Sequence, residues 1–307
     1  MDSQKRENVL NLALNATTEE RMKSFVLDTG FEAKTQLWEV IVRYDTGVLS
    51  EKEEKEGLWE QLQKAGVLGE REVEQARGIR VVELIGGYGI LTLEKSQILK
   101  LSEVSKITYI EMPKRLFFSV DKGRAASCIS PIQSGAIGGV RKKLLGKGVL
   151  VAILDSGIDY FHPDFRNRDG STRILRIWDQ TAIWQPTQEG LIRYQTGREY
   201  TKEQIDEALS SNTREEALAL VPVTDGTTSG HGTAVASIAA GNGRGSQGEQ
   251  YRGVAPESSI LIVKVGTARE NGFPRTTELM MAVDYTLRTA AALNMPVAIN
   301  ISIGNNY

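Results

Sequence analysis

The sequence predicts an α/β protein in which a parallel sheet flanked by helices follows a smaller α+β domain. Three observations predict this. An unbroken apolar run at residues 148–154 is typical of a strand buried on both faces of a parallel sheet. Two more apolar strands are predicted after it, and helices are predicted between the strands, which indicates right-handed crossovers. Residues 37–111, which precede this run, alternate short strands with two short helices.

The smaller domain is predicted at residues 31–112, with the element order β-α-β-β-α-β that is typical of a ferredoxin-like fold. Strands are predicted at residues 37–44, 79–85, 88–93 and 107–111, and helices at residues 50–65 and 94–104. Gly86 and Gly87 suit a tight hairpin between the middle strands, because glycine adopts positive φ at little cost. Residues 1–30 are predicted to be a polar tail. This fold alone indicates no function.

The second domain is predicted at residues 141–307, after a linker at residues 113–140 that is rich in glycine, alanine and proline. After the first strand, the predicted elements are a helix at residues 231–240, a strand at 260–265, a helix at 276–293 and a strand at 297–303. The polar stretch at residues 168–225, with a helical pattern at 201–220, is interpreted as an insertion on one face.

Composition excludes several classes of protein. The formal net charge of −2 gives no indication of binding to nucleic acid or to an anionic membrane. Cys128 is the single cysteine, so no internal disulfide forms, and this thiol in the linker is interpreted as inert. No secretory signal and no apolar run long enough to span a membrane is found, which predicts a cytoplasmic protein.

Two short motifs carry the candidate chemistry. Asp155-Ser156-Gly157 ends the first buried strand, where functional groups gather in open α/β sheets. Gly230-His231-Gly232-Thr233 begins a predicted helix, whose dipole biases a histidine toward its neutral form. A neutral imidazole is a general base, and an aspartate that accepts from its other ring nitrogen fixes the tautomer. The motifs therefore predict Asp155 as the orienting acid and His231 as the base.

In this order, the two motifs resemble the Asp and His boxes of subtilisin-like serine proteases, the subtilases of peptidase family S8. Gly253-Val254-Ala255-Pro256 also resembles the segment that follows the His helix in that family. Residues 34–112 resemble the family's inhibitory propeptide. The amino-acid sequence at residues 110–115 and 178–180 is most similar to that of clostridial subtilases related to germination proteases.

The resemblance implies a serine endopeptidase that acts on polypeptides and holds its own propeptide in the active-site groove. Ser302, Ile303 and Gly304 would bind the substrate backbone. No cofactor is expected. Asp164 matches a calcium-binding position of some members, but residues 242–245 do not clearly supply further ligands, so calcium is not predicted. His162 is interpreted as a structural neighbour of Asp155, and Asp159 as a residue that forms hydrogen bonds within the loop.

The nucleophile is the part of the triad that the motifs do not supply. The resemblance places the family's serine box and oxyanion asparagine C-terminal to Tyr307, so the sequence is expected to be incomplete. Ser134 and Ser229 are interpreted as linker and loop serines. Two hypotheses remain: an endopeptidase that matures by cleavage near residues 112–130, or an inactive pseudoprotease that binds polypeptides.

Overall fold

The computed structural model describes residues 5–24, 26–45, 57–114, 117–118, 143–185, 191–225, 230–267 and 274–304. The chain divides into two compact units. The first comprises residues 1–115 and 275–281, and the second comprises residues 116–274 and 282–307. Most of the predicted linker, including Cys128, lies outside the described residues.

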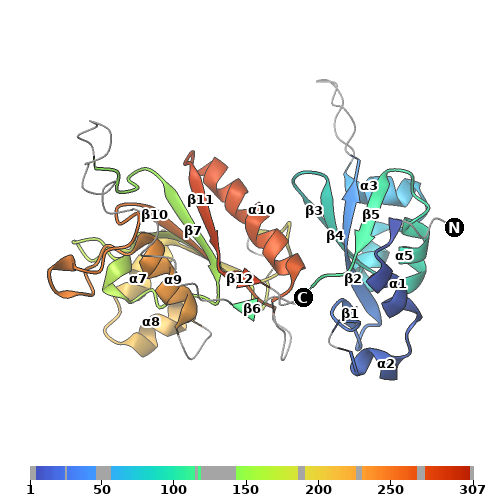
Figure 1. Ribbon diagram of the computed structural model, residues 1–307, viewed down its shortest axis with the longest axis horizontal. Coiled ribbons are helices and arrows are strands. Elements are labelled where there is room, and N and C mark those ends of the chain that lie inside the picture. The colour runs from blue at the N-terminus through green and yellow to red at the C-terminus, as the bar shows by residue number, and fades with distance from the viewer. Residues whose placement is uncertain are drawn as a thin grey trace. The chain divides into compact units, whose positions relative to one another are not determined.

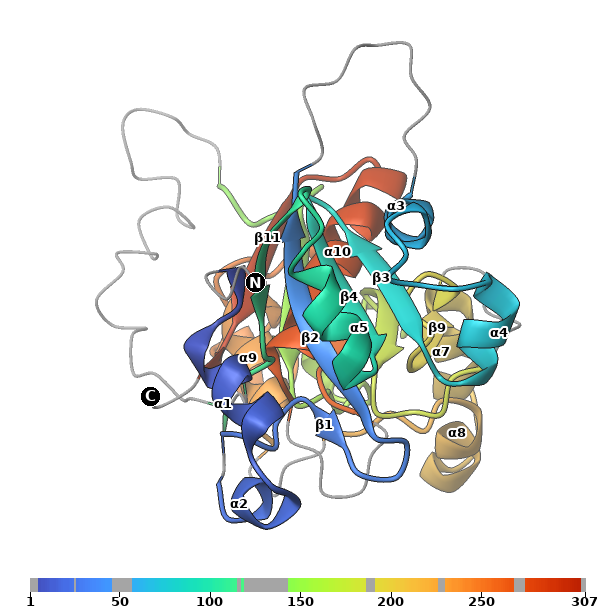
Figure 2. The ribbon, with the colours of Figure 1, turned by 90° about the vertical axis from the view of Figure 1, so that its right-hand side faces the viewer.

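The first unit contains an antiparallel sheet with helices on one face, as Figure 2 shows for α1, α3 and α5. Strands β5, β2, β4 and β3 are neighbours in that order. The short strand β1 also pairs with β2, antiparallel, at the residues 37 and 38 that begin β2. This is the ferredoxin-like strand order, as predicted. The elements of this unit are α1 (Asn8–Asn15), α2 (Thr18–Met22), β1 (Phe31–Glu32), β2 (Leu37–Tyr44), α3 (Leu58–Lys64), α4 (Arg71–Ala76), β3 (Arg80–Leu84), β4 (Tyr88–Leu93), α5 (Lys95–Leu101) and β5 (Ile107–Glu111).

The prediction of a polar tail is wrong for α1. Leu10 and Leu14 lie one helical turn apart, and both are buried in the core of the first unit together with Ala13. Their spacing places them on one face of the helix, and burial of that apolar face holds α1 on the sheet. The first unit therefore includes residues that the sequence analysis left outside it. The helix expected at residues 50–65 is described only as α3.

The second unit is built on a five-stranded sheet in the order β11-β7-β10-β8-β9. Neighbouring strands among β11, β7, β10 and β8 are parallel, and β9 is antiparallel to β8. Its elements are β6 (Phe117–Phe118), β7 (Leu150–Asp155), β8 (Ile174–Asp179), β9 (Arg198–Thr201), α7 (Lys202–Leu209), α8 (Arg214–Leu220), α9 (His231–Ala240), β10 (Ser259–Lys264), α10 (Thr276–Ala292, from residue 282 on), β11 (Val297–Ile301) and β12 (Ile303–Gly304).

Helices cover both faces of this sheet, and Figure 1 shows α10 on one side and α7, α8 and α9 on the other. Every residue of β7 is buried, as its apolar run predicted. Val151 and Ile153 of β7 pack in one cluster with Ala236 and Ala240 of α9. The small alanine side chains let α9 approach the sheet closely, which places the first residue of α9 near the carboxyl end of β7.

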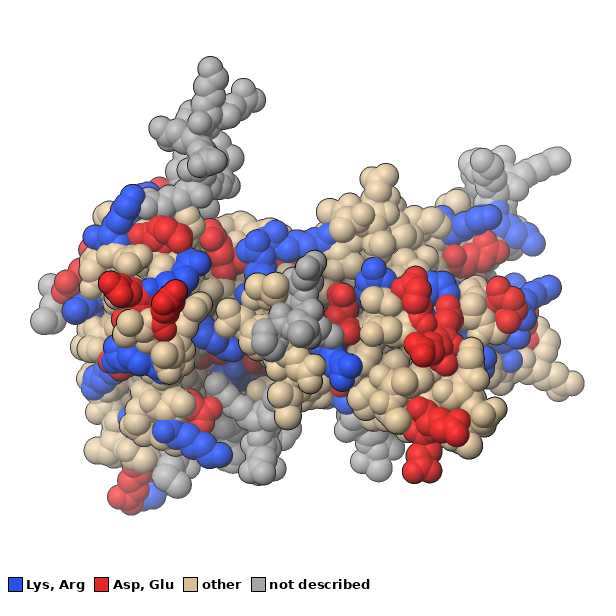
Figure 3. All heavy atoms as spheres, turned by 180° about the vertical axis from the view of Figure 1, so that it is seen from behind, with Lys and Arg blue, Asp and Glu red and all other residues tan. Residues whose placement is uncertain are grey.

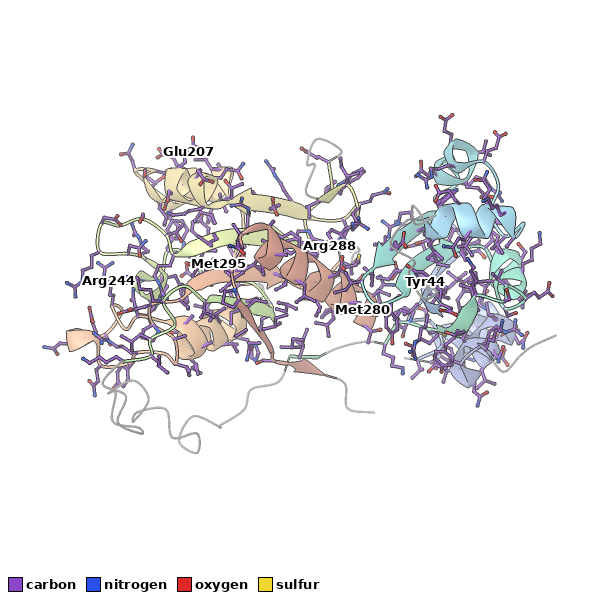
Figure 4. All side chains as sticks on the ribbon, turned by 90° about the horizontal axis from the view of Figure 1, so that it is seen from above. Tyr44, Glu207, Arg244, Met280, Arg288 and Met295 are labelled. Carbon is purple, nitrogen blue, oxygen red and sulfur yellow. The ribbon has the colours of Figure 1, made fainter. Side chains whose placement is uncertain are left out.

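The other face of the sheet is anchored by aromatic side chains and a buried carboxylate. The Trp178 and Tyr285 rings lie 4.8 Å apart between centroids. The Tyr194 hydroxyl donates to Asp284 Oδ2 over 2.8 Å, and Arg288 Nε donates to the same oxygen over 2.8 Å. Arg288, labelled in Figure 4, projects from α10. These contacts fix α10 against β8.

The interpretation of residues 168–225 as an insertion is wrong for β8, which is a strand of the main sheet paired in parallel with β10. Arg176 interrupts its apolar pattern, and charged residues at Arg173 and Asp179 flank or end it, so the sequence does not reveal the strand. The helical pattern at residues 201–220 forms two helices, α7 and α8, because a new capping box begins at Thr213.

Among the described residues, no helix is long and apolar enough to cross a membrane. On the face seen in Figure 3, Lys and Arg side chains are interspersed with Asp and Glu over the described residues. That face therefore presents no extended patch of a single sign.

Candidate active site

Asp155 and His231 meet at the carboxyl end of the parallel sheet. His231 Nδ1 lies 2.6 Å from Asp155 Oδ1, although the two residues are 76 positions apart in the chain. The side chain of Asp155 is 1% exposed and that of His231 is 5% exposed. Two groups of this kind, buried and in direct contact, have the geometry of an acid–histidine pair.

The local backbone explains why the sequence needs glycines at this point. Gly157 turns the chain after β7 with φ of 123°, and a Cβ there would lie 2.3 Å from the Thr224 carbonyl oxygen. A Cβ on Gly232 would lie 2.3 Å from the Gly157 carbonyl oxygen. Gly230 precedes α9 in the left-handed region, with φ of 64°. Side chains at these positions would push the strand end and the helix start apart.

Burial dominates the electrostatics of Asp155. Desolvation raises the pKa of the Asp155 carboxyl above its usual range, and hydrogen bonds from His231 and from the Ser156 amide partly oppose that rise. The Ser156 amide donates to Asp155 Oδ1 over 2.7 Å. Oδ2 is buried and has no hydrogen-bond partner among the described residues. A buried carboxylate with one unpaired oxygen costs stability, which is typical of functional sites.

This geometry assigns different tasks to the two imidazole nitrogens. With Nδ1 donating to Asp155, the neutral ring carries its lone pair on Nε2. His231 is the first residue of α9, where the positive end of the helix dipole favours the neutral ring. The pair can therefore accept a proton at Nε2 from a hydroxyl nucleophile, while Asp155 stabilises the imidazolium that forms.

The predicted substrate-binding residues follow the edge strand β11. Ser302 lies between β11 and β12, and its hydroxyl donates to Asn300 Oδ1 over 2.9 Å. Ile303 and Gly304 form β12, whose backbone pairs antiparallel with Phe118 and Phe117 of β6. The edge is thus able to bind an extended chain through backbone hydrogen bonds, as in β-strand addition.

His162 and Asp164, which follow Asp155 in the chain, form hydrogen bonds that stabilise the local structure. His162 Nδ1 accepts from the Asp164 amide over 3.3 Å at the start of a single 3₁₀ turn, Pro163–Phe165. Asp164 Oδ2 accepts from Ser237 Oγ over 2.6 Å, and Oδ1 accepts from the Gly245 amide over 2.8 Å. Both carboxylate oxygens of Asp164 thus bond to protein groups. Among the described residues, no group of three or more His, Cys, Asp or Glu could hold a metal ion.

Three further side chains support the site: Ser156 and Thr233, which the motifs contain but to which no role was assigned, and Asp225, which was not singled out. Their hydrogen bonds join the strand end to the helix start. An aspartate six residues before a histidine has no distinctive pattern, so only the structure reveals Asp225 there. Ser134 and Ser229 lie outside the described residues.

Comparison with known families assigns a family to each of the two parts of the chain. The sequence model of the subtilase family, Peptidase_S8, matches residues 146–306. The model of the Csp protease B prodomain matches residues 4–65 and 49–114. The expected resemblance to subtilases with a propeptide of the clostridial type is therefore confirmed, and the prodomain match includes the α1 region that had been predicted as a tail.

Solved structures with a similar fold include the Clostridium perfringens CspB protease, at 32% identity and a TM-score of 0.46 over 59% of this chain and 33% of that chain. They also include fervidolysin from Fervidobacterium pennivorans, a keratinolytic enzyme related to subtilisin, at 14% identity and a TM-score of 0.45 over 88% of this chain and 36% of that one. The epidermin leader peptide processing protease of Staphylococcus aureus matches at 16% identity and a TM-score of 0.41, over 87% of this chain and 50% of that one. The chain thus spans between a third and a half of these structures. Because the subtilase model matches more than half of its residues, the chain belongs to the subtilase family.

Proposed function

We propose that the full-length protein is a serine endopeptidase in which Asp155 orients His231 and His231 is the general base. The observation that carries this proposal is the buried hydrogen bond of 2.6 Å between His231 Nδ1 and Asp155 Oδ1, at the carboxyl end of the sheet. The match to the subtilase family supports it independently.

The proposed chemistry is acyl transfer through a serine that we expect C-terminal to residue 307, where the family's third box lies. His231 Nε2 takes the proton of the serine hydroxyl as its oxygen attacks the scissile carbonyl carbon. The tetrahedral intermediate expels the amine, which receives the proton from the imidazolium. Water then hydrolyses the acyl-enzyme with His231 acting as base again.

Substrate polypeptides are proposed to bind as an extended strand beside Ser302, Ile303 and Gly304. Support comes from the antiparallel pairing of Ile303 and Gly304 with Phe118 and Phe117, because the same backbone groups bind any extended chain. The segment that pairs there directly follows the prodomain match at residues 4–114. We therefore propose that the protein's own propeptide occupies this groove before maturation.

The experiment is hydrolysis of an unstructured protein by purified full-length wild type and by His231→Ala, with the products identified by mass spectrometry. Cleavage by the wild type that the variant abolishes would support the proposal. Binding of the same protein without cleavage, by a folded and processed wild type, would contradict it and support the pseudoprotease hypothesis.

A further inference from the structure

Three chain segments converge beside the Asp155–His231 pair with no space between their backbones. They are the turn at Ser156 and Gly157, the stretch that ends at Thr224 and Asp225, and the start of α9. The two glycines there, at positions 157 and 232, each lie so close to a neighbouring carbonyl that a Cβ would clash at 2.3 Å. We call the place where these three segments meet the junction, and its close contacts therefore set the separation between the end of β7 and His231.

The start of α9 lacks an ordinary cap. The residue before the helix is Gly230, which has no side chain to accept from the first amides. Helices leave these amides without intrahelical partners, and a missing cap costs stability. Two groups from elsewhere in the chain replace it: Ser156 Oγ accepts from the Gly232 amide over 3.0 Å, and Asp225 Oδ2 accepts from the Thr233 amide over 2.7 Å.

Asp225 connects these groups to one another. Its Oδ1 accepts from Ser156 Oγ over 2.6 Å, and its Oδ2 also accepts from Thr233 Oγ1 over 2.7 Å. The Ser156 amide in turn donates to Asp155 Oδ1. One carboxylate thus holds the residue that follows Asp155 and the residue two positions after His231.

We propose that Asp225 is a positioning residue of the active site, which caps α9 through space and holds His231 at hydrogen-bond distance from Asp155. This inference rests on the proposed function, because it assigns Asp225 a role in that reaction. The proposal includes no contact between Asp225 and the substrate. A negative charge at the start of α9 also complements the helix dipole there.

The main test is Asp225→Asn in the full-length protein, with Asp206→Asn as the matched control. The Asn side chain keeps the shape of Asp, but its amide group cannot accept from the Thr233 groups and from Ser156 at the same time. Asp206 also accepts a backbone amide, that of Thr172 over 2.5 Å, but it lies on α7 away from the junction. We expect Asp225→Asn to lower kcat for peptide hydrolysis about ten- to a hundredfold with KM within about twofold of wild type. Asp206→Asn should leave kcat unchanged.

A second readout does not depend on hydrolysis. Nuclear magnetic resonance of ¹⁵N-histidine in the full-length protein reports which ring nitrogen of His231 carries the proton, with His231→Gln used for assignment and His162 as an internal reference. Wild type should show the Nδ1–H tautomer, and Asp225→Asn a mixture with the Nε2–H form. Unchanged kcat and tautomer in a variant that only loses thermal stability would overturn the proposal. If wild type cleaves no peptide, the proposed function fails, and the tautomer still decides the role of Asp225.

Discussion

Two segments of the second unit each bring an aspartate close to a histidine, and they use the same residue types differently. At the end of β7, Asp155 accepts directly from the His231 ring, and both side chains are buried. A few residues later, the His162 ring accepts from a backbone amide, and the Asp164 carboxylate braces Ser237 and Gly245. In the first segment the ring contacts a carboxylate, and in the second the ring accepts from a backbone amide and lies 5.6 Å, between centroids, from the Phe165 ring.

The difference shows which environment suits a histidine to act as a general base and which gives it a structural role. His231 begins α9, and its Nδ1 lies 2.6 Å from the carboxylate of Asp155, which comes from another segment, so Nε2 is the nitrogen that the proposed reaction assigns to proton transfer. His162 uses Nδ1 to cap its own turn, and the Asp164 carboxylate two residues away accepts from Ser237 of α9 and from the Gly245 amide. Substitutions in the first segment should therefore affect activity, and substitutions in the second should affect stability.

The largest effect is expected from His231→Ala, compared with His162→Ala. Removal of the general base should lower kcat of the full-length protein by about 10⁴- to 10⁶-fold, as for other triad histidines. His162→Ala should leave kcat within about threefold, because that ring only caps one 3₁₀ turn. Rates of peptide hydrolysis by the two purified variants make the comparison, and equal losses would erase the distinction between the segments.

Asp155→Asn should lower kcat by about 10⁴-fold, because the amide disfavours the tautomer that leaves Nε2 unprotonated. It should also change how stability depends on pH. Burial raises the pKa of Asp155, so protonation favours the folded state, and this contribution is present below the pKa of an unfolded aspartate, about 3.9. It is lost as pH rises through the folded pKa.

The Asn side chain does not titrate, so Asp155→Asn should lack this loss and gain stability relative to wild type as pH rises above about 4. Urea unfolding of both proteins from acidic to neutral pH measures the difference. A variant that loses stability at neutral pH relative to wild type would contradict the assignment of Asp155 as a desolvated, strained group.

Arg173→Met tests what stabilises the segment that contains His162 and Asp164. The guanidinium donates to the backbone carbonyls of Asp164, Ala240 and Ser258, and burial lowers its pKa to about 10. Met fills similar space but leaves three buried acceptors without that donor. We expect a loss of about 3 kcal/mol in the free energy of unfolding, with kcat of the folded protein retained.

The control for this variant is Arg168→Met, whose side chain is 88% exposed and lies 3.7 Å from Glu249. An exposed pair of this kind contributes little, so its effect should stay below about 0.5 kcal/mol. Equal destabilisation by both variants in urea unfolding would show that the buried carbonyl contacts do not brace this segment.

The smallest effect is expected from Arg214→Ala. Arg214 on α8 pairs with Asp159 over 2.9 Å, and its guanidinium carbon lies 4.4 Å from the centre of the Phe161 ring. The Arg214 side chain is 56% exposed, so solvent screens the ion pair. A loss below about 1 kcal/mol, smaller still in 1 M salt, is expected in thermal unfolding. A larger loss, insensitive to salt, would show that α8 is part of the site's support.

The features of the site and of the fold that have local patterns could be predicted from the sequence. The apolar run that ends at Asp155 identified the buried strand β7, and the glycines around His231 identified the helix start. The β-branched and aromatic run at residues 37–44, and the order of strands and helices that follows it, identified the ferredoxin-like order of the first unit. Each of these features depends on residues that are close together in the chain.

Features that depend on contacts between distant parts of the chain could not be predicted from the sequence. Asp225 bonds to Ser156, 69 positions away, and no local pattern marks either residue as a partner. Strand β8 carries charged residues at Arg176 and Asp179, and its identity depends on pairing with β10. Helix α1 is a different case: the spacing of Leu10, Ala13 and Leu14 already indicated an apolar face, but the polar surroundings outweighed it.

The central claim is that His231, oriented by Asp155, activates a serine. The most direct measurement is covalent labelling of full-length wild type, His231→Ala and His162→Ala with a serine-directed fluorophosphonate, with the modified residue mapped by mass spectrometry. We predict that one serine is labelled in wild type and in His162→Ala, and that labelling is lost in His231→Ala. Absence of labelling in folded, processed wild type, or equal labelling in His231→Ala, would contradict the claim.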